Sequence, residues 1–495
     1  MTAPNAAHGH PYIPNALPDV QAAMLAAIGA ASIDALYGDI PEELRFRGVM
    51  NLPAPLTAES ALRRHVEGIL NRNQSCQEAI SFLGGGSARH YVPAVCDEVN
   101  HRAEFVSAYA GEPYEDHGRF QALFEYASLM GELLDLDVVN VPTYDWNQAA
   151  STALRMAGRI TGRRQALVAA TTGPERFTTM RNYCQSALEL MPVAFDPATG
   201  LLCLDDLRRK LSRDTACIYF ENPSYLGCIE HRGAEIADLA HRHGALCVVG
   251  VDPISLGVLA PPSQYGADIT CGDLQPLGLH MNQGGALAGF IATRDEERFV
   301  REYPSRLFGL TTTAVPGEWG FGDVLYDDRT SFGAREKGKE FVGTAAALWG
   351  ITAGVYLASM GPAGMRQVGQ TILQKAQYAA KRLSELRGVT LPFGGTAHFK
   401  EFVVDFRGTG LSVAHINRAL LAKHIYGGID LTGKFPGLDG CALVCVTELH
   451  TQEDIDTLVH TLRDILAERA PTCWPIRSAA NVSTRPNGRS RSSCS

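Results

Sequence analysis

The feature that most constrains the fold is an alternation of strand-like and helix-like segments between residues 137 and 292. Short apolar runs such as QALVAA (165–170), ACIYF (216–220) and LCVVGV (246–251) are typical of buried strands. The segments 147–162 and 232–244 between them have the spacing of amphipathic helices. This alternation predicts an α/β fold with a mostly parallel sheet that helices cover on both faces.

The rest of the chain divides around this core, and we expect four parts. Residues 1–117 form a helical N-terminal arm, 118–340 the large domain, 341–470 a small C-terminal α/β domain, and 471–495 a disordered basic tail. Thr57 and Thr451 are expected to cap the helices that follow them. Two long helices, broken by GPAG at 361–364, are expected to open the small domain. The tail has four arginines, no acid and no apolar periodicity, which favours disorder.

Composition excludes several classes of function. The net charge of −9 argues against nucleic acid as the main partner. No apolar run reaches the roughly 18–20 residues that a membrane helix needs, and residues 1–15 lack the pattern of a secretory signal. The 12 cysteines form no CxxC pair and fit a reducing cytosol, so we expect a cytoplasmic protein without a metal site.

A large α/β domain followed by a small one resembles the aspartate-aminotransferase-like enzymes of fold type I, which use pyridoxal phosphate (PLP). Their chemistry needs a lysine that binds the aldehyde, an acid beside the pyridine nitrogen, and a helix N-terminus for the phosphate. Asp252, at the end of a buried strand, is the candidate acid. The turn with Asp145, Asn147 and Gln148 is the candidate phosphate site. Alternatively, Asp252 only starts a turn, and the polar turn is an ordinary helix cap.

The lysine is missing from the turn where the layout requires it. The stretch ADITCGDLQPLGLHMNQGGALAGF (267–290) carries Gln275 and Pro276 at the turn, and no lysine occurs between residues 211 and 336. Pro276 has no amine that could condense with an aldehyde. We therefore predict that the chain forms no covalent link to PLP at this place, and that any retained cofactor contacts are vestigial.

Five long motifs carry a family resemblance in the same order along the chain. They are IPEELRFRGVMNLPAPL (40–56), SFLGGGSARHYVPAV (81–95), EFVSAYAGEPYEDHGRFQALFEY (104–126), VPTYDWNQAAS (141–151) and GADITCGDLQPLGLHMNQGG (266–285). Together they resemble the P-protein family of the glycine cleavage system, in its separate subunit 1 and in the N-terminal half of the fused form. The likeness covers residues 10–468.

The resemblance implies an activity and partners. It implies glycine dehydrogenase (aminomethyl-transferring), EC 1.4.4.2, in which a lysine-bearing subunit 2 carries the PLP. Glycine loses CO2, and the aminomethyl group passes to the lipoyl arm of the H-protein. The family also suggests a heterotetramer with two copies of each subunit.

The resemblance also implies site residues on two loops. Gly84, Gly85 and Gly86 would let one loop approach the subunit interface closely, with His90 and Tyr91 in contact with it. Four residues would line the mouth of the partner's cofactor pocket: Tyr109, Glu112, Tyr114 and Glu115. Ordinary loop packing is the alternative for each of them.

Departures from the family pattern leave two other hypotheses open. The family's PYQ and EISQG are replaced within GEPYEDHG, YDGAT reads YDWNQ, and REKATSNICT reads REKGKEFVGT. The chain could therefore be a divergent scaffold or regulatory pseudoenzyme of a related PLP-dependent complex. It could also be an independent PLP enzyme that uses Lys337 or Lys339, although this KGK stretch is expected to be exposed.

Overall fold

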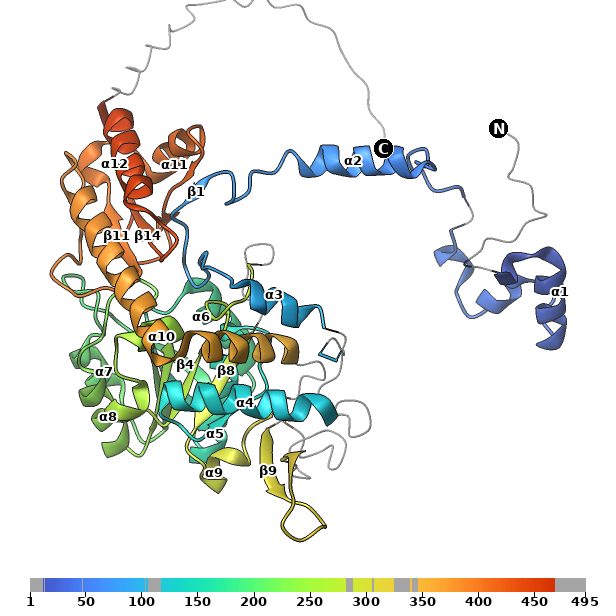
Figure 1. Ribbon diagram of the computed structural model, residues 1–495, viewed down its shortest axis with the longest axis horizontal. Helices are drawn as coiled ribbons and strands as arrows, with labels where there is room; N and C mark the ends of the chain where they lie inside the picture. The colour runs from blue at the N-terminus through green and yellow to red at the C-terminus, as the bar shows by residue number, and fades with distance from the viewer. Residues whose placement is uncertain are drawn as a thin grey trace, which may run out of the picture. The chain divides into compact units, whose positions relative to one another are not determined.

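The computed structural model divides the chain into two compact units, Met1–Gln74 and Ser75–Ser495 (Figure 1). It describes residues 12, 14–46, 48–102, 104–105, 117–281, 288–304, 307–324, 339–340 and 346–467. Residues 75–117, which we assigned to the N-terminal arm, fall within the second unit. The expected tail, 471–495, lies outside the described residues.

The first unit consists of short helices with apolar side chains on their surfaces. Its helices are η1 (Pro14–Ala16), α1 (Pro18–Ala27), η2 (Ile33–Tyr37), η3 (Glu42–Leu44) and α2 (Glu59–Leu70). None of its described residues is buried. The expected cap at Thr57 is wrong, because α2 begins at Glu59 and Ala58 holds the capping position without a side-chain hydrogen bond.

The second unit is built on a seven-stranded sheet with the order β2-β8-β7-β6-β5-β3-β4. Neighbours from β7 to β4 run parallel, whereas β8 is antiparallel to both β7 and β2. The strands are β2 (Val138–Val139), β3 (Gln165–Ala169), β4 (Glu189–Val193), β5 (Thr215–Glu221), β6 (Leu246–Val251), β7 (Ile269–Asp273) and β8 (Gly289–Thr293). The predicted mostly parallel sheet is thus confirmed.

Both faces of this sheet are buried under helices. Along β3, Leu167 belongs to one apolar cluster and Val168 to another, as period-two alternation requires. The helices are α4 (His117–Leu134), α5 (Trp146–Thr161), α6 (Pro174–Cys184), α7 (Leu204–Lys210), α8 (Gly233–Arg242), α9 (Glu297–Val300), and the short turns η4 (Pro253–Gly257) and η5 (Pro262–Tyr265). The spacing of ERFTTMRNYCQSALEL (175–190) predicts a single helix, but α6 ends at Cys184 and Glu189 already pairs with β3.

The region expected as the small domain, 341–470, contains a long helix, α10 (Ala347–Ser384), in which Gly361 adopts a non-helical φ of 58°. The expected break at GPAG is therefore present. The domain's sheet has the order β11-β14-β13. The Thr451 cap is confirmed, since its Oγ1 accepts from the N–H of Asp454 at 3.1 Å. Its elements are β11 (Glu401–Asp405), η7 (Arg407–Thr409), α11 (Val413–Leu421), β12 (Ile425–Tyr426), β13 (Ile429–Asp430), β14 (Cys441–Cys445) and α12 (Gln452–Ala467).

Four further elements belong to the described part of the second unit. A two-residue strand, β1 (Ile80–Ser81), pairs with β12, so the chain just before the SFLGGG motif is attached to the small domain. The helix α3 (Ala94–Asn100) follows that motif. Strands β9 (Phe308–Thr312) and β10 (Trp319–Asp323) form an antiparallel hairpin.

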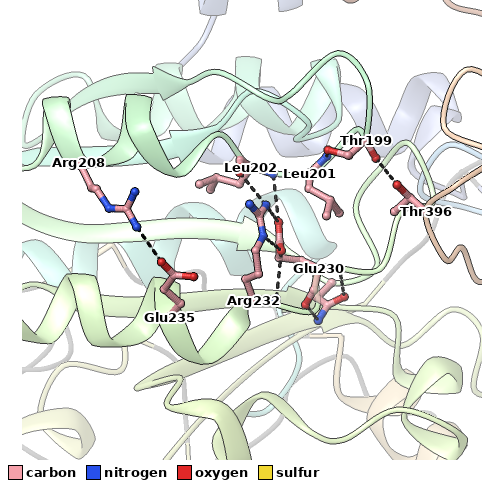
Figure 2. A network of polar contacts seen from close by, with 9 residues as sticks. Thr199, Leu201, Leu202, Arg208, Glu230, Arg232, Glu235 and Thr396 are labelled. Carbon is pink, nitrogen blue, oxygen red and sulfur yellow. Dashed lines mark hydrogen bonds and ion pairs between the residues drawn. The ribbon is translucent and has the colours of Figure 1, made fainter.

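Polar contacts join the large domain to the segment that leads into β11 (Figure 2). The Thr396 hydroxyl donates to the carbonyl oxygen of Thr199 at 2.8 Å. Close by, the Glu230 carboxylate accepts from the N–H of Leu202 and from Arg232, at 3.0 and 2.9 Å. These contacts position the start of β11 at the carboxyl ends of the large-domain strands. In the described part of the chain, no helix is long and apolar enough to cross a membrane.

Candidate functional site

The candidate site is a cavity where the carboxyl ends of β5, β6 and β7 meet the start of β11. This is where open α/β sheets bind their ligands. Asp252, Pro276 and Lys400 are among the residues that line the cavity. Its volume is about 30 Å³, far below the roughly 300–1,000 Å³ of pockets that enclose small ligands.

The turn after β7 holds no amine in the cavity. Pro276 lies on the cavity wall. The preceding Gln275 is 2% exposed; its amide donates to the Leu279 carbonyl oxygen at 3.1 Å, and its side-chain oxygen accepts from the N–H of Ala88 at 3.5 Å. This turn is therefore a packing element that binds the loop after Gly86.

Asp252 is paired with a lysine that sequence reasoning missed. Its Oδ2 lies 2.5 Å from Nζ of Lys400, and both residues are 8% exposed. Burial works to lower the pKa of Lys400, but the Asp252 carboxylate raises it above its ordinary value. Asp252 also accepts the N–H of Ile254 and caps η4, as its alternative interpretation proposed. The acid expected beside a pyridine nitrogen thus already has a cation from this chain.

A second buried ion pair occupies the neighbouring wall. Arg176 Nη1 lies 2.5 Å from Oε1 of Glu221, which also accepts from the Tyr219 hydroxyl at 3.0 Å. The guanidinium carbon of Arg176 stands 3.7 Å from the ring centroid of Trp146, a cation–π contact. The Glu221 carboxylate and the Trp146 ring together hold Arg176 across the cavity.

The candidate phosphate turn is capped by its own carboxylate. Asp145 is the N-cap of α5: its Oδ1 accepts from the N–H of Gln148 at 2.7 Å and its Oδ2 from the Asn147 amide at 3.1 Å. The Gln148 side chain accepts from the N–H of Tyr144 at 2.9 Å. An anion at this helix end would meet the negative charge of Asp145.

A buried acid, Asp273, ends β7 and also lines the cavity. It is 4% exposed, and its Oδ1 accepts from the N–H of Gln275 at 2.7 Å. Burial, with a contribution from the Asp145 charge, raises the pKa of Asp273 to about 7. Asp273 also lines a second, more open pocket of about 310 Å³ at the N-terminus of α5.

Two glycines of the SFLGGG motif, Gly84 and Gly85, approach the small domain closely, whereas a Cβ on Gly86 would lie 3.4 Å from Arg176 of α6. A Cβ on Gly84 would lie 2.3 Å from Oε1 of Glu401, and one on Gly85 would lie 2.5 Å from Cδ1 of Ile429. Gly85 and Gly86 have φ values of +79° and +106°, which favour glycine. The N–H of Gly85 donates to Glu401 at 2.5 Å. This requirement for glycine comes from the chain's own packing.

His90 and Tyr91 are both attached to Glu448. Nδ1 of His90 lies 2.9 Å from Oε2 of Glu448, and the N–H of Tyr91 donates to Oε1 at 2.7 Å. His90 is buried, whereas the Tyr91 side chain is 62% exposed. Burial opposes ionisation of Glu448, but His90 and the N–H of Tyr91 lower its pKa to about 2.

The structure separates the remaining candidates. Tyr109, Glu112, Tyr114, Glu115 and Lys337 lie outside the described residues. Lys339 is not exposed as expected: its side chain is 10% exposed and pairs with Glu302 at 3.2 Å, and it does not line the cavity. Among the described residues there is no cluster suited to a metal ion.

Sequence reasoning missed Lys400, Arg176 and Glu448. A lysine directly before an apolar strand, as in HFKEFVVDF (398–406), is a weak signal, because such a lysine is usually solvated. Lys400 meets Asp252 only after the small domain has docked on the large one. No local sequence pattern predicts the contact between Lys400 and Asp252.

The residues present do not fit PLP. The turn has no amine, the Asp252 carboxylate is paired with Lys400, and the Asp145 carboxylate occupies the helix end that would bind the phosphate. We therefore derive no chemical step through PLP bound in this pocket.

Comparison with known proteins gives a consistent family. The model of the glycine cleavage system P-protein matches residues 10–462. The chain is 37% identical over 468 residues to the probable glycine dehydrogenase (decarboxylating) subunit 1 of Staphylothermus marinus, covering 93% of this chain and 99% of the relative. It is 39% identical over 470 residues to the protein of the same name from Aeropyrum pernix, covering 92% and 99%.

Solved structures agree with these sequence relatives. An inhibitor-bound crystal structure of glycine decarboxylase (P-protein) superposes with a TM-score of 0.79 at 32% identity, over 90% of this chain and 98% of the other. A sphingosine-1-phosphate lyase from Burkholderia pseudomallei, with a TM-score of 0.61 and 15% identity over 86% of this chain and 94% of the other, shares the fold alone. The chain belongs to the P-protein family of the glycine cleavage system.

Proposed function

We propose that this chain is the subunit of a glycine decarboxylase that carries no PLP of its own and works only with a lysine-bearing subunit 2. The partner supplies the PLP, which acts as the electron sink for loss of CO2 from glycine. The complex then passes the aminomethyl group to the lipoyl arm of an H-protein. The activity corresponds to EC 1.4.4.2, in a cytoplasmic heterotetramer with two copies of each subunit.

The observation that carries the proposal is the content of the chain's own cavity. Pro276 stands where a lysine would be needed, and the acid that would face a pyridine nitrogen is paired with Lys400 at 2.5 Å. A chain built in this way has the fold of a PLP enzyme without the groups that hold PLP. Its part in the reaction is then to shape and close the site of another chain.

The first unit supports an obligate partner. On α2, the side chains of Leu62, Val66, Ile69 and Leu70 are 44–57% exposed and follow the i, i+4, i+7, i+8 spacing of one helix face. An apolar face of this kind is costly in water and typical of a protein–protein interface. We propose subunit 2 as the chain that covers it.

The loop from Gly84 to Tyr91 is the proposed contribution to the partner's site. Glu401 and Glu448 hold its backbone at Gly85 and Tyr91, while the Tyr91 ring remains exposed. A fixed loop with an exposed aromatic ring is suited to line another chain's pocket. We keep Tyr109, Glu112, Tyr114 and Glu115 as further proposed lining residues.

The test is reconstitution from separate parts. The chain is mixed with its lysine-bearing partner, PLP and a lipoylated carrier protein, and exchange of labelled bicarbonate into glycine is measured. Exchange is expected from the mixture and from neither subunit alone. Exchange by this chain alone with PLP would contradict the proposal, as would a stable complex whose glycine turnover does not depend on this chain.

A further inference from the structure

We infer that Lys400 is a positioning residue that replaces the protonated pyridine nitrogen on Asp252 and thereby fixes His90 and the loop from Gly84 to Tyr91. In this family's fold the acid at the end of β6 normally faces a cation that belongs to the cofactor. Here the chain supplies that cation itself. The part of this inference that concerns the partner's site rests on the proposed function.

The charge balance of the cavity requires such a replacement. Asp252 is 8% exposed, and an unpaired carboxylate at that depth would be strongly unfavourable. The ammonium group of Lys400 is 2.5 Å away and equally buried. The Asp252 carboxylate at the end of β6 is therefore neutralised by Lys400, and no bound ligand is needed to neutralise it.

The same pair joins the two domains. Asp252 belongs to the large domain, whereas Lys400 directly precedes β11 of the small domain, and its carbonyl oxygen accepts from the N–H of Val446 at 2.8 Å. The docked arrangement of the two domains therefore depends on a contact inside the chain. A chain that never binds PLP in this cavity would otherwise lose the ligand that holds the domains together.

A series of further contacts connects Lys400 to the proposed interface loop, Gly84 to Tyr91. Nζ of Lys400 lies 3.4 Å from Nε2 of His90, whose other ring nitrogen lies 2.9 Å from Glu448. Glu448 in turn accepts the N–H of Tyr91. The next residue after Lys400, Glu401, accepts the N–H of Gly85. Two adjacent side chains thus hold the loop near both of its ends.

The test compares Lys400→Met with a matched control, Arg232→Met. The control breaks the pair between Arg232 and Glu230, which also lies at the domain junction but does not line the cavity (Figure 2). Hydrogen exchange of the isolated chain is followed at the Gly85 and Tyr91 amides and, as an internal reference, in β3. We expect Lys400→Met to speed exchange at the two loop amides at least 10-fold relative to β3, and Arg232→Met to leave that ratio unchanged.

A double variant separates positioning from stability. In Lys400→Met/Asp252→Asn the uncompensated carboxylate is gone, so the thermal midpoint should recover most of the loss seen in Lys400→Met. The loop amides should still exchange fast, because His90 has no ammonium group beside it. Unchanged loop exchange in Lys400→Met, or an equal effect in Arg232→Met, would overturn the inference.

Ligand binding provides a second readout. Pyridoxamine 5′-phosphate cannot condense with surface lysines, so it reports the cavity alone. Titration calorimetry is expected to give no binding to the wild-type chain at 1 mM ligand. Binding to the wild-type chain, or borohydride trapping of pyridoxal phosphate on Lys400, would contradict the replacement.

With the partner present, Lys400→Met should lower kcat for bicarbonate exchange more than it raises KM for glycine. If the wild-type mixture is inactive, the proposed function fails, whereas the exchange and calorimetry results on the isolated chain still decide the role of Lys400.

Discussion

The N–H of Gly85 donates to Oε1 of Glu401 at 2.5 Å, although 316 positions separate the two residues along the chain. This contact ties the glycine-rich loop to the first residue of β11. The loop backbone packs so closely here that a side chain on Gly84 or Gly85 would clash with neighbouring side chains.

Gly84→Ala is expected to destabilise the chain by about 1–3 kcal/mol, because the added Cβ would lie 2.6 Å from Cβ of Cys445 and 2.3 Å from Glu401. Urea unfolding of the isolated chain measures the change. Gly395→Ala is the control, since its Cβ would have no neighbour within 4 Å. Equal stability of the two variants would show that the loop does not pack as described.

Arg176→Met is expected to cost roughly 3–5 kcal/mol, because it leaves the Glu221 carboxylate buried without its cation. The matched control is Arg208→Met, which breaks an exposed pair with Glu235 (Figure 2). Such surface pairs contribute about 0–1 kcal/mol. Denaturant titration of both variants gives the comparison, and a small effect at Arg176 would contradict the buried pair.

Acid should destabilise the chain through Glu448. Its pKa in the folded state is about 2, against an ordinary value of 4.5. A lowered pKa means that its stabilisation is complete above pH 4.5 and is lost as the pH falls toward 2. The loss from this group is about 3.5 kcal/mol, at roughly 1.4 kcal/mol per pKa unit. Glu448→Gln should be less stable than wild type at pH 6, with a difference that shrinks as the pH approaches 3.

Asp273 should destabilise the chain as the pH rises, whereas Glu448 destabilises it as the pH falls. Its pKa is raised from 3.8 to about 7, so its contribution is most favourable below pH 3.8 and is lost as the pH rises through 7. Asp273→Asn keeps an oxygen that can accept from the N–H of Gln275 but removes the titration. The variant's thermal midpoint should therefore exceed that of wild type at pH 8 by several degrees, and the difference should shrink as the pH falls below 7 and vanish below pH 3.8.

The apolar face of α2 should be needed for association and dispensable for folding. Leu62→Glu/Val66→Glu is expected to abolish complex formation with subunit 2 in analytical ultracentrifugation, because it places two charges on the apolar face. The thermal midpoint of the isolated chain should change little, since both side chains are already exposed. Arg64→Gln, on the opposite face, is the control, and loss of association there too would argue against a specific interface.

The local sequence pattern was sufficient to predict the sheet of the large domain. Apolar runs at 165–169, 215–221 and 246–251 are buried on both faces, and only a strand inside a covered sheet satisfies such runs. Boundaries were less predictable: the helix from Pro174 ends at Cys184 because Glu189 pairs with β3. That pairing is a long-range contact, and helical spacing alone does not reveal it.

The sequence alone shows that no lysine occurs between residues 211 and 336. This absence rules out a covalent link to an aldehyde at the turn, whatever the surrounding residues are. The sequence also marked Asp252, Asp145 and the three glycines by their local context. Tertiary structure alone decided what each of them meets. Lys400 reaches Asp252, Arg176 reaches Glu221, and Glu401 reaches Gly85 only when separate elements dock, since burial creates the need for these charge pairs and domain packing brings their members together.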